Sequence, residues 1–218
     1  MNPTGTRARK SRSGGLVGLV ALGVLAAAVL ARAGAEPERL VVDASRSHLR
    51  LELDRTGLVK WLGHVHHIEA PLAEGQIEVT EGDPAHSSVR LRFEAGRLFV
   101  IPGSEPAGDI PKVEERMRGP EVLEVAKYPE IVFASTSVKS QPEGPARFRL
   151  VVAGTLTLKG RTFAVEVPLE AQRVDGGIDA KGELFLNLLD IGIEPVSVAG
   201  VVKVANRFRL EFEIHARP

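Results

Sequence analysis

The sequence predicts an all-β fold: a single antiparallel β-barrel of about eight strands, with a short helical insertion near residues 109–127. Long segments alternate apolar and polar residues, as strands do when one face meets an apolar interior and the other meets water. Short turns that contain glycine separate many of these segments. The insertion instead shows the three- and four-residue spacing of a helix face.

The strands are predicted from segments whose apolar residues recur at every second position. Such strands can hide their apolar faces in a sandwich of two sheets or in a closed barrel, and long hairpins favour the barrel because closure removes exposed edges. A barrel of this size is filled by side chains or holds one small ligand. Pro168 cannot donate to a ladder, so we expect it at a bulge or in an unpaired stretch. The clearest segments are 47–55, 88–95, 147–157, 161–172, 178–189 and 207–214.

The helical insertion is predicted from Ile110, Val113 and Met117, which recur on one helix face. Asp109 is expected to cap the start. Gly119-Pro120 is expected to stop the helix, because glycine accepts the left-handed conformation and proline cannot continue a helix. We expect the three apolar side chains to act as a lid that covers the mouth of the barrel, or to pack against the wall beside it.

Residues 1–35 have the pattern of a signal peptide. Basic residues cluster within 7–12, an unbroken run of Gly, Ala, Val and Leu covers 15–31, and 33–35 reads Ala-Gly-Ala, the small-residue form that a signal peptidase cleaves. The alternative is an uncleaved N-terminal anchor, which would be the chain's membrane span. In either case the barrel domain, residues 36–218, is expected to be periplasmic or secreted.

The composition excludes several classes of function. Five of the 28 Lys and Arg residues and none of the 28 Asp and Glu residues lie in 1–35, so residues 36–218 carry a formal net charge of −5. A mildly acidic domain is a poor nucleic-acid binder. The absence of cysteine excludes disulfides, thiolate catalysis and zinc ribbons. Neither a nucleophile elbow nor a glycine-rich phosphate loop occurs, so the sequence predicts no enzyme and no cofactor.

Four motifs, in order, resemble those of the YceI-like family. Members of this family are small extracytoplasmic proteins with a lipocalin-shaped barrel that binds polyisoprenoid or similar amphiphilic lipids. The similarity extends from about Leu40 to Ala216, nearly all of the barrel domain. The motifs are Val42-Asp43 to Ser47-His48-Leu49, Met117-Arg118 through Lys127-Tyr128-Pro129 to Ser135, Gly154 to Gly160, and Asp190-Ile191-Gly192-Ile193.

The resemblance implies that the barrel binds a lipid without catalysis. The expected partner is a long-chain amphiphilic lipid such as an isoprenoid quinone, a polyprenol derivative or a fatty amide, and a homodimer is left open. A barrel with a filled core that serves as an interaction module is one alternative. Apolar residues on inward faces are the candidates to line the ligand, although plain core packing would use the same residues. They are Leu51, Phe93, Phe133, Phe148, Leu156, Phe163, Leu184 and Phe212.

A histidine cluster supports a different alternative, a metal-binding protein or a metal-dependent hydrolase. His64 and His66 lie two residues apart, so on a strand both imidazoles project from one face and could share a metal, whereas His67 points the other way. A third ligand would have to come from His48, His86 or a carboxylate elsewhere. The pair could instead contact a lipid head group.

Overall fold

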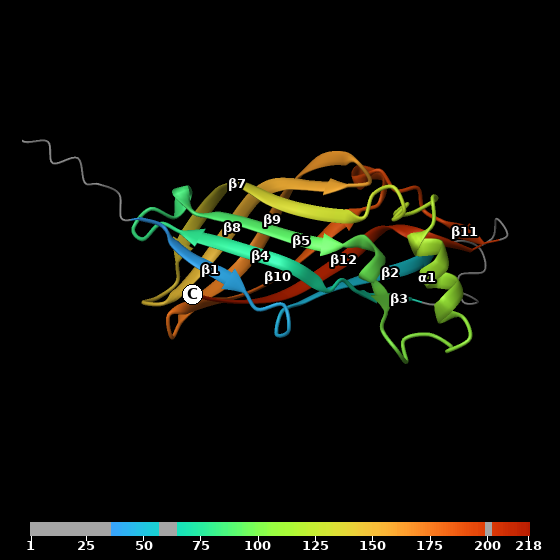
Figure 1. Cartoon of the computed structure of the whole chain (residues 1–218), viewed down its shortest axis with the longest axis horizontal. Helices are drawn as coiled ribbons and strands as arrows, with labels where there is room; N and C mark the ends of the chain where they lie inside the picture. Colours follow the sequence, from blue (N-terminus) through green and yellow to red (C-terminus); the bar gives the residue numbers. More distant parts are fainter. Residues whose placement is uncertain (1–35, 57–64, 199–201) are drawn as a thin grey trace, which may run out of the picture. The chain divides into compact units, whose positions relative to one another are not determined.

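The elements of the fold are labelled as in Figure 1, in a computed structural model that describes residues 36–56, 65–198 and 202–218. Within these residues the α-helix α1 spans Ile110–Arg118, and short 3-10 helices span Pro84–His86 (η2), Ala95–Arg97 (η3) and Leu189–Ile191 (η4). The strands are β1 (Glu38–Val42), β2 (His48–Thr56), β3 (His66–Glu69), β4 (Leu72–Val79), β5 (Ser88–Glu94), β6 (Phe99–Val100), β7 (Glu130–Pro142), β8 (Arg147–Leu158), β9 (Arg161–Val174), β10 (Gly177–Asn187), β11 (Ser197–Val198) and β12 (Val202–Arg217).

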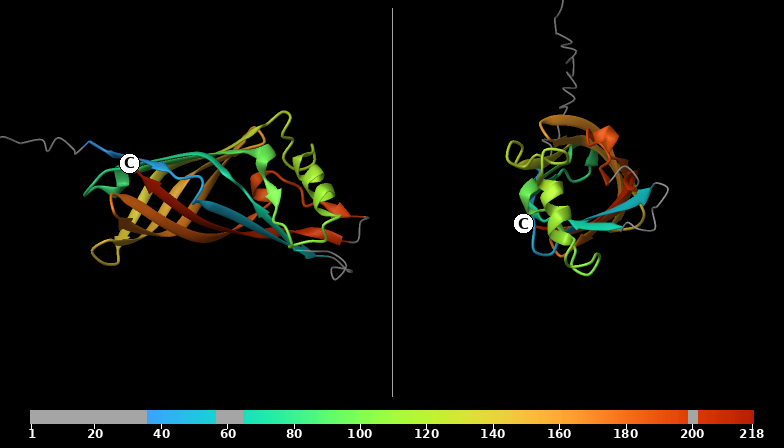
Figure 2. Two further views of the ribbon diagram at one scale, coloured as in Figure 1. Left: turned by 60° about the horizontal axis from the view of Figure 1, so that its bottom comes forward. Right: turned by 90° about the vertical axis from the view of Figure 1, so that its right-hand side faces the viewer.

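The strands form one antiparallel sheet that closes on itself (Figures 1 and 2). The order around the ring is β1-β4-β5-β7-β8-β9-β10-β12, and β12 pairs with β1 to close it. β12 also pairs with β2, which is followed by β3 and β6. The pairs β1/β2, β3/β4 and β5/β6 therefore each form one long strand that is interrupted once. Counted in this way the ring has eight strands, which confirms the predicted barrel.

The β8–β9 hairpin shows how local sequence sets the register. Lys159 and Gly160 both have positive φ, 51° and 68°, as in the two-residue turns whose twist matches that of paired strands. From this turn the pairing runs without interruption from Leu158–Arg161 to Arg147–Gln172. Gly160 also packs against Tyr128, because a Cβ there would lie 2.5 Å from Cε1 of that ring. The turn therefore requires glycine for its conformation and for this contact.

The pairing between β9 and β10 covers only one end of the two strands. Five pairs join them, from Gly177–Val174 to Lys181–Glu170. Residues 161–169 of β9 and 182–187 of β10 have no mutual pairs, although β9 stays paired with β8 and β10 with β12. We call these two segments the unpaired seam. Pro168 lies in the seam and pairs with Val151 of β8. Its missing N–H therefore costs no bond to β10, as predicted for an unpaired stretch.

Helix α1 lies across one end of the barrel (Figure 2, right). It stops at Arg118, before Gly119-Pro120, as predicted. Two predicted details were wrong. The carboxylate of Asp109 accepts a hydrogen bond from Nζ of Lys112 at 3.1 Å instead of capping the helix, because its own backbone is already helical. Gly119 has φ −72° and is extended, so the following proline ends the helix without a left-handed residue.

The buried core follows the inner faces of the strands and includes the inner side of α1. None of the helices in the described ranges is long and apolar enough to cross a membrane. The largest contributions to the core come from β1, β4 and β12, with Leu40, Val42, Leu72, Ile77, Phe208, Phe212, Ile214 and Ala216, and from Met117 of α1.

Candidate functional site

The eight candidate lining residues all lie on the face that carries the core. Phe93, Leu184 and Phe212 are buried, with 5%, 9% and 9% of their surface exposed. The other five point the same way but stay half-buried, and strand pairing brings Phe133 opposite Leu156 and Leu156 opposite Phe163. The half-buried five are Leu51, Phe133, Phe148, Leu156 and Phe163. Whether they touch a ligand stays a prediction.

Partial exposure is unusual for large apolar side chains on the inner face of a barrel. In a filled core, such side chains interdigitate and leave almost no accessible surface. Here further inward residues beside the core, including Leu49, Leu53, Leu91, Leu169 and Leu210, are also only partly buried. Some inward-facing apolar side chains therefore keep accessible surface that other side chains do not cover.

Two inward-facing glycines make room for aromatic rings on this face. A Cβ at Gly154 would lie 2.8 Å from the ring of Phe133, and one at Gly182 would lie 2.5 Å from the ring of Phe212. Sequence reasoning missed this arrangement, although Gly154 belongs to one of the four motifs. The sequence signal was a glycine in the interior of a strand, which often marks the close approach of another group.

Helix α1 is attached to the barrel by polar contacts, and one of its three predicted lid residues, Met117, belongs to the core. Met117 belongs to the buried core with 6% exposure, and Ile110 and Val113 are half-buried. Glu114 accepts a hydrogen bond from the backbone N–H of Val100 at 3.0 Å. Arg118 donates to the carbonyls of Gly96 and Leu98. The helix is thereby fixed at this end of the barrel, and a role in covering a ligand stays a prediction.

On the inner face, His66 forms a hydrogen bond with the buried side chain of Glu105. Nδ1 of His66, in β3, lies 2.6 Å from Oε1 of Glu105, in the loop before α1. The Glu105 side chain is 1% exposed, so this contact gives a buried polar group its partner. Sequence reasoning missed Glu105, because its partner His66 lies 39 positions away and no local pattern marks the contact.

The metal alternative gains no support from the described residues. His64 lies outside them, His66 is engaged by Glu105, His48 contacts Glu69 and His86 contacts Asp83. Among the residues that the structure describes, no three His, Cys, Asp or Glu side chains form a group that could hold a metal ion.

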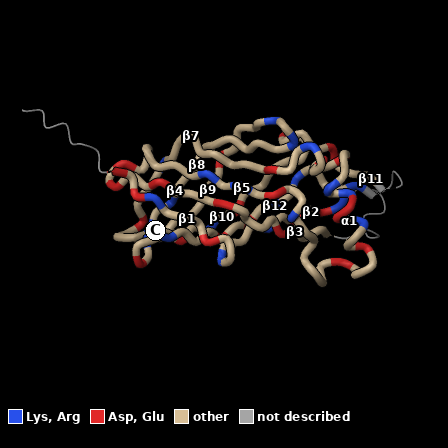
Figure 3. The backbone as a smooth tube through the Cα atoms, viewed as in Figure 1, with Lys and Arg blue, Asp and Glu red and all other residues tan. Residues whose placement is uncertain are grey.

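A groove of about 550 Å³ is lined by residues of β2, β8, β9, β10 and β12. Its lining combines basic residues such as Arg50 and Lys181 with acidic ones such as Glu183 and Glu213, and Phe212 and Gly182 also contribute. Figure 3 shows the same mixture of both signs along the barrel strands. This groove has no concentration of one charge that would select an anion or a cation.

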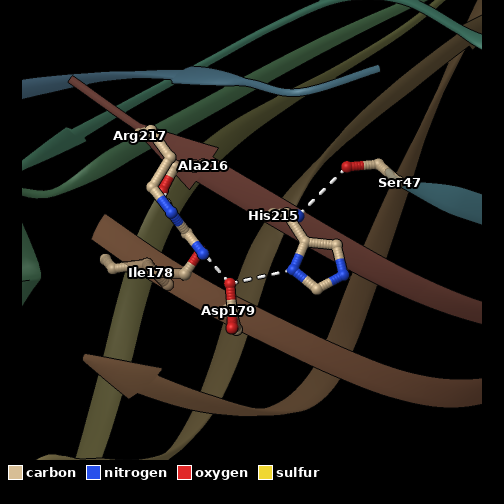
Figure 4. A network of polar contacts seen from close by, with 6 residues as sticks. All are labelled: Ser47, Ile178, Asp179, His215, Ala216 and Arg217. Carbon is tan, nitrogen blue, oxygen red and sulfur yellow. Dashed lines mark hydrogen bonds and ion pairs between the residues drawn. The ribbon is translucent and has the colours of Figure 1, made fainter. Parts of the chain in front are cut away.

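A second polar cluster joins Ser47, Asp179 and His215, the residue types of a hydrolytic triad (Figure 4). Nδ1 of His215 lies 2.9 Å from Asp179, but the Ser47 hydroxyl accepts a hydrogen bond from the backbone N–H of His215 and does not contact its ring. Burial alone would raise the pKa of Asp179, but hydrogen bonds from His215 and Arg217 outweigh it and lower the pKa. Because no base contacts the serine, the cluster does not activate a nucleophile.

Proteins of known structure share this fold. The fold is similar to that of Burkholderia cenocepacia BcnA, with a TM-score of 0.60, 16% identity and coverage of 80% of this chain and 98% of that one. It is also similar to a polyisoprenoid binding domain from Saccharophagus degradans implicated in plant cell wall breakdown, with a TM-score of 0.58, 16% identity and coverage of 82% and 97%. At this identity the two likenesses concern the fold.

The sequence comparisons concern the family. The chain is 30% identical over 127 residues to a UPF0312 protein of Pseudomonas savastanoi pv. phaseolicola, an alignment that covers 56% of this chain. The chain spans 60% of the length of this curated relative. The model of the YceI-like domain matches residues 40–216, from the third residue of β1 to the last but one residue of β12. The protein therefore belongs to the YceI-like domain family.

Proposed function

We propose that this protein is an extracytoplasmic carrier that holds an amphiphilic lipid of the polyisoprenoid type inside its barrel. The observation that carries the proposal is the set of large apolar side chains on the inner face that stay partly exposed. A hydrocarbon chain would cover them and gain about 0.8 kcal/mol for each buried methylene. No catalytic group is required for such binding.

Two further observations support the proposal. A polyisoprenoid binding domain shares this fold. The basic and apolar pattern of residues 1–35 favours export, and an exported carrier would meet lipids in the periplasm or outside the cell. The lipid class includes isoprenoid quinones, polyprenol derivatives and fatty amides, all of which combine a long apolar chain with a small polar group.

A charge placed on the inner face tests this function. Leu156→Glu puts a carboxylate among the inner side chains, so binding of a dansyl-labelled long-chain alkylamide should weaken by about tenfold or more, because a charge in an apolar site is costly. Ala164→Glu, on the outer face of the same hairpin, is the matched control and should bind normally. Fluorescence titration measures both. Equal affinities in the two variants would place the ligand outside the barrel.

Identification of a lipid that co-purifies with the protein is a complementary test. The protein purified from its own host, extracted with organic solvent and analysed by mass spectrometry, should yield about one long-chain lipid per chain. Recovery of the protein without any lipid, together with no binding of the labelled alkylamide, would contradict the carrier function.

A further inference from the structure

His66 faces the interior of the barrel at the end where α1 lies. It pairs with Leu53 across β2 and β3, while Ile68 pairs with Leu51, and directly paired residues of an antiparallel ladder share one face. Ile68 is buried in the core, so His66 is on the inner face too. Leu53 and Ile68 beside it on that face are apolar, whereas Arg55, which follows Leu53 on the same face, forms an ion pair with Asp54. The imidazole is therefore a polar group next to the apolar side chains of Leu53 and Ile68.

Glu105 fixes the orientation of this imidazole. A carboxylate can only accept hydrogen bonds, so Nδ1–H of His66 donates to Oε1 of Glu105. The contact is short, at 2.6 Å, and the Glu105 side chain is almost completely buried. A carboxylate in this position holds a histidine ring in one tautomer and one direction.

The other ring nitrogen of His66 remains available. Nε2 makes no hydrogen bond to another part of the chain that the structure describes, and 22% of the side chain is exposed. Nδ1 of His66 is thus bonded to Glu105, whereas Nε2 is accessible to a ligand. An oriented, accessible hydrogen-bonding atom at the end of an apolar space is the arrangement by which ligand sites select a polar group.

We propose that Nε2 of His66 binds the head group of the lipid, and that this head group is uncharged, of the hydroxyl or amide class. The inference rests on the proposed carrier function and specifies its ligand. The carboxylate of Glu105 already lies beside this imidazole, so a carboxylate or phosphate brought to the same place would add a second negative charge close to the first. A neutral head group forms the hydrogen bond without that cost, and its chain extends past Leu53 and Leu51 into the barrel.

The test compares four probes of one chain length: an alcohol, a primary amide, a fatty acid and an alkane. The wild-type protein should bind the alcohol and the amide about tenfold more tightly than the alkane, a difference of about 1.4 kcal/mol, and the acid should bind no better than the alkane. The double substitution His66→Leu with Glu105→Leu removes the pair without leaving a buried charge. It should lower the alcohol and amide affinities to that of the alkane and leave the alkane unchanged.

Two further variants keep the result interpretable. His86→Leu is the matched control, because that imidazole contacts Asp83 at 2.7 Å but is exposed, and it should change no affinity. Glu105→Gln keeps the side-chain shape and removes the charge, so the acid should gain relative to the alcohol. Thermal unfolding of each variant confirms that it is folded.

The outcomes separate the two proposals. Tightest binding of the fatty acid by the wild type, or an alcohol preference that survives in the double variant, overturns the head-group assignment while the carrier function stands. Failure of the wild-type protein to bind all four probes overturns both.

Discussion

Ser47 shows how one buried hydroxyl holds an interrupted strand in place. The corner 43–47 between β1 and β2 lies opposite His215 of β12, where the ladder is broken. The backbone N–H of Asp43 donates to the carbonyl of His215 at 2.7 Å, and the backbone N–H of His215 donates to the Ser47 hydroxyl at 3.0 Å. Ser47 therefore replaces a backbone carbonyl in the ladder. This gives the Ser47-His48 motif a structural explanation.

Removal of that hydroxyl should destabilise the barrel. Ser47→Ala leaves the N–H of His215 without its partner, and Ser47 is 5% exposed, so the free energy of unfolding should fall by about 1 to 3 kcal/mol. Urea denaturation measures the change. Ser45→Ala, at an exposed hydroxyl of the same corner that bonds Asp43, should cost clearly less. Equal losses for the two serines would show that the burial of Ser47 has no special importance.

Residues such as Glu105 and Ser47 mark the limit of what the sequence predicts. Alternation along each strand was sufficient to identify the inner face, because it depends on neighbours in the chain. Ser47 bonds a residue 168 positions away, and Glu105 bonds one 39 positions away. Neither contact leaves a local pattern. The candidate site was therefore predicted as a set of apolar residues with His64 and His66 as possible head-group contacts, while Glu105, the partner of His66, was found only in three dimensions.

At the scale of elements, α1 combines an apolar contact with polar attachments. Met117 packs into the core, while Glu114 and Arg118 bond the backbone between 96 and 100, next to β6. The three-and-four spacing predicted the helix and its inner face. It did not predict the polar attachments, because these depend on where the preceding loop places the helix.

Truncation of Met117 tests how firmly α1 is fixed. Met117→Ala removes a side chain with 6% exposure from the core, so the free energy of unfolding should decrease by about 2 to 5 kcal/mol. Arg116→Ala, one residue earlier on the exposed side, should change it by about 0.5 kcal/mol or less. Thermal or urea unfolding compares the two. A small loss at Met117 would mean that α1 packs loosely on the barrel.

At the scale of the whole molecule, the described residues form a closed ring in which the β5–β7 and β9–β10 junctions have five pairs each. The β9–β10 join contains the unpaired seam. Pro168 provided the sequence signal for this join, but its extent could not be predicted, because the divergence of two strands depends on the curvature of the entire barrel. Beyond the pair Glu170–Lys181, β9 and β10 are not paired with each other. Over the same region β9 remains paired with β8, and β10 remains paired with β12.

Hydrogen exchange should detect the seam. In the hairpin register, alternate residues of β9 bond β8, so the amides of Ala164 and Glu166 face β10, where no pair and no loop hydrogen bond of the described residues reaches them. These amides should exchange about tenfold or more faster than those of Phe163 and Val165. Exchange followed by nuclear magnetic resonance resolves single residues. Uniform protection along β9 would show that the ladder is complete in solution.

The seam also affects how the barrel wall can deform, because β9 and β10 are not held together along their whole length. A barrel whose neighbouring strands are all hydrogen-bonded along their full length has a fixed diameter, because widening it requires backbone hydrogen bonds to break. A ring that is joined by five pairs at one end and free along the rest of that junction can widen there with its other ladders intact. For the proposed carrier, such a wall would admit chains of different thickness, straight or branched. The part of the seam without pairs lies at the end of the barrel that holds His66, because Leu186 pairs with Phe208, Phe208 with Leu53 and Leu53 with His66.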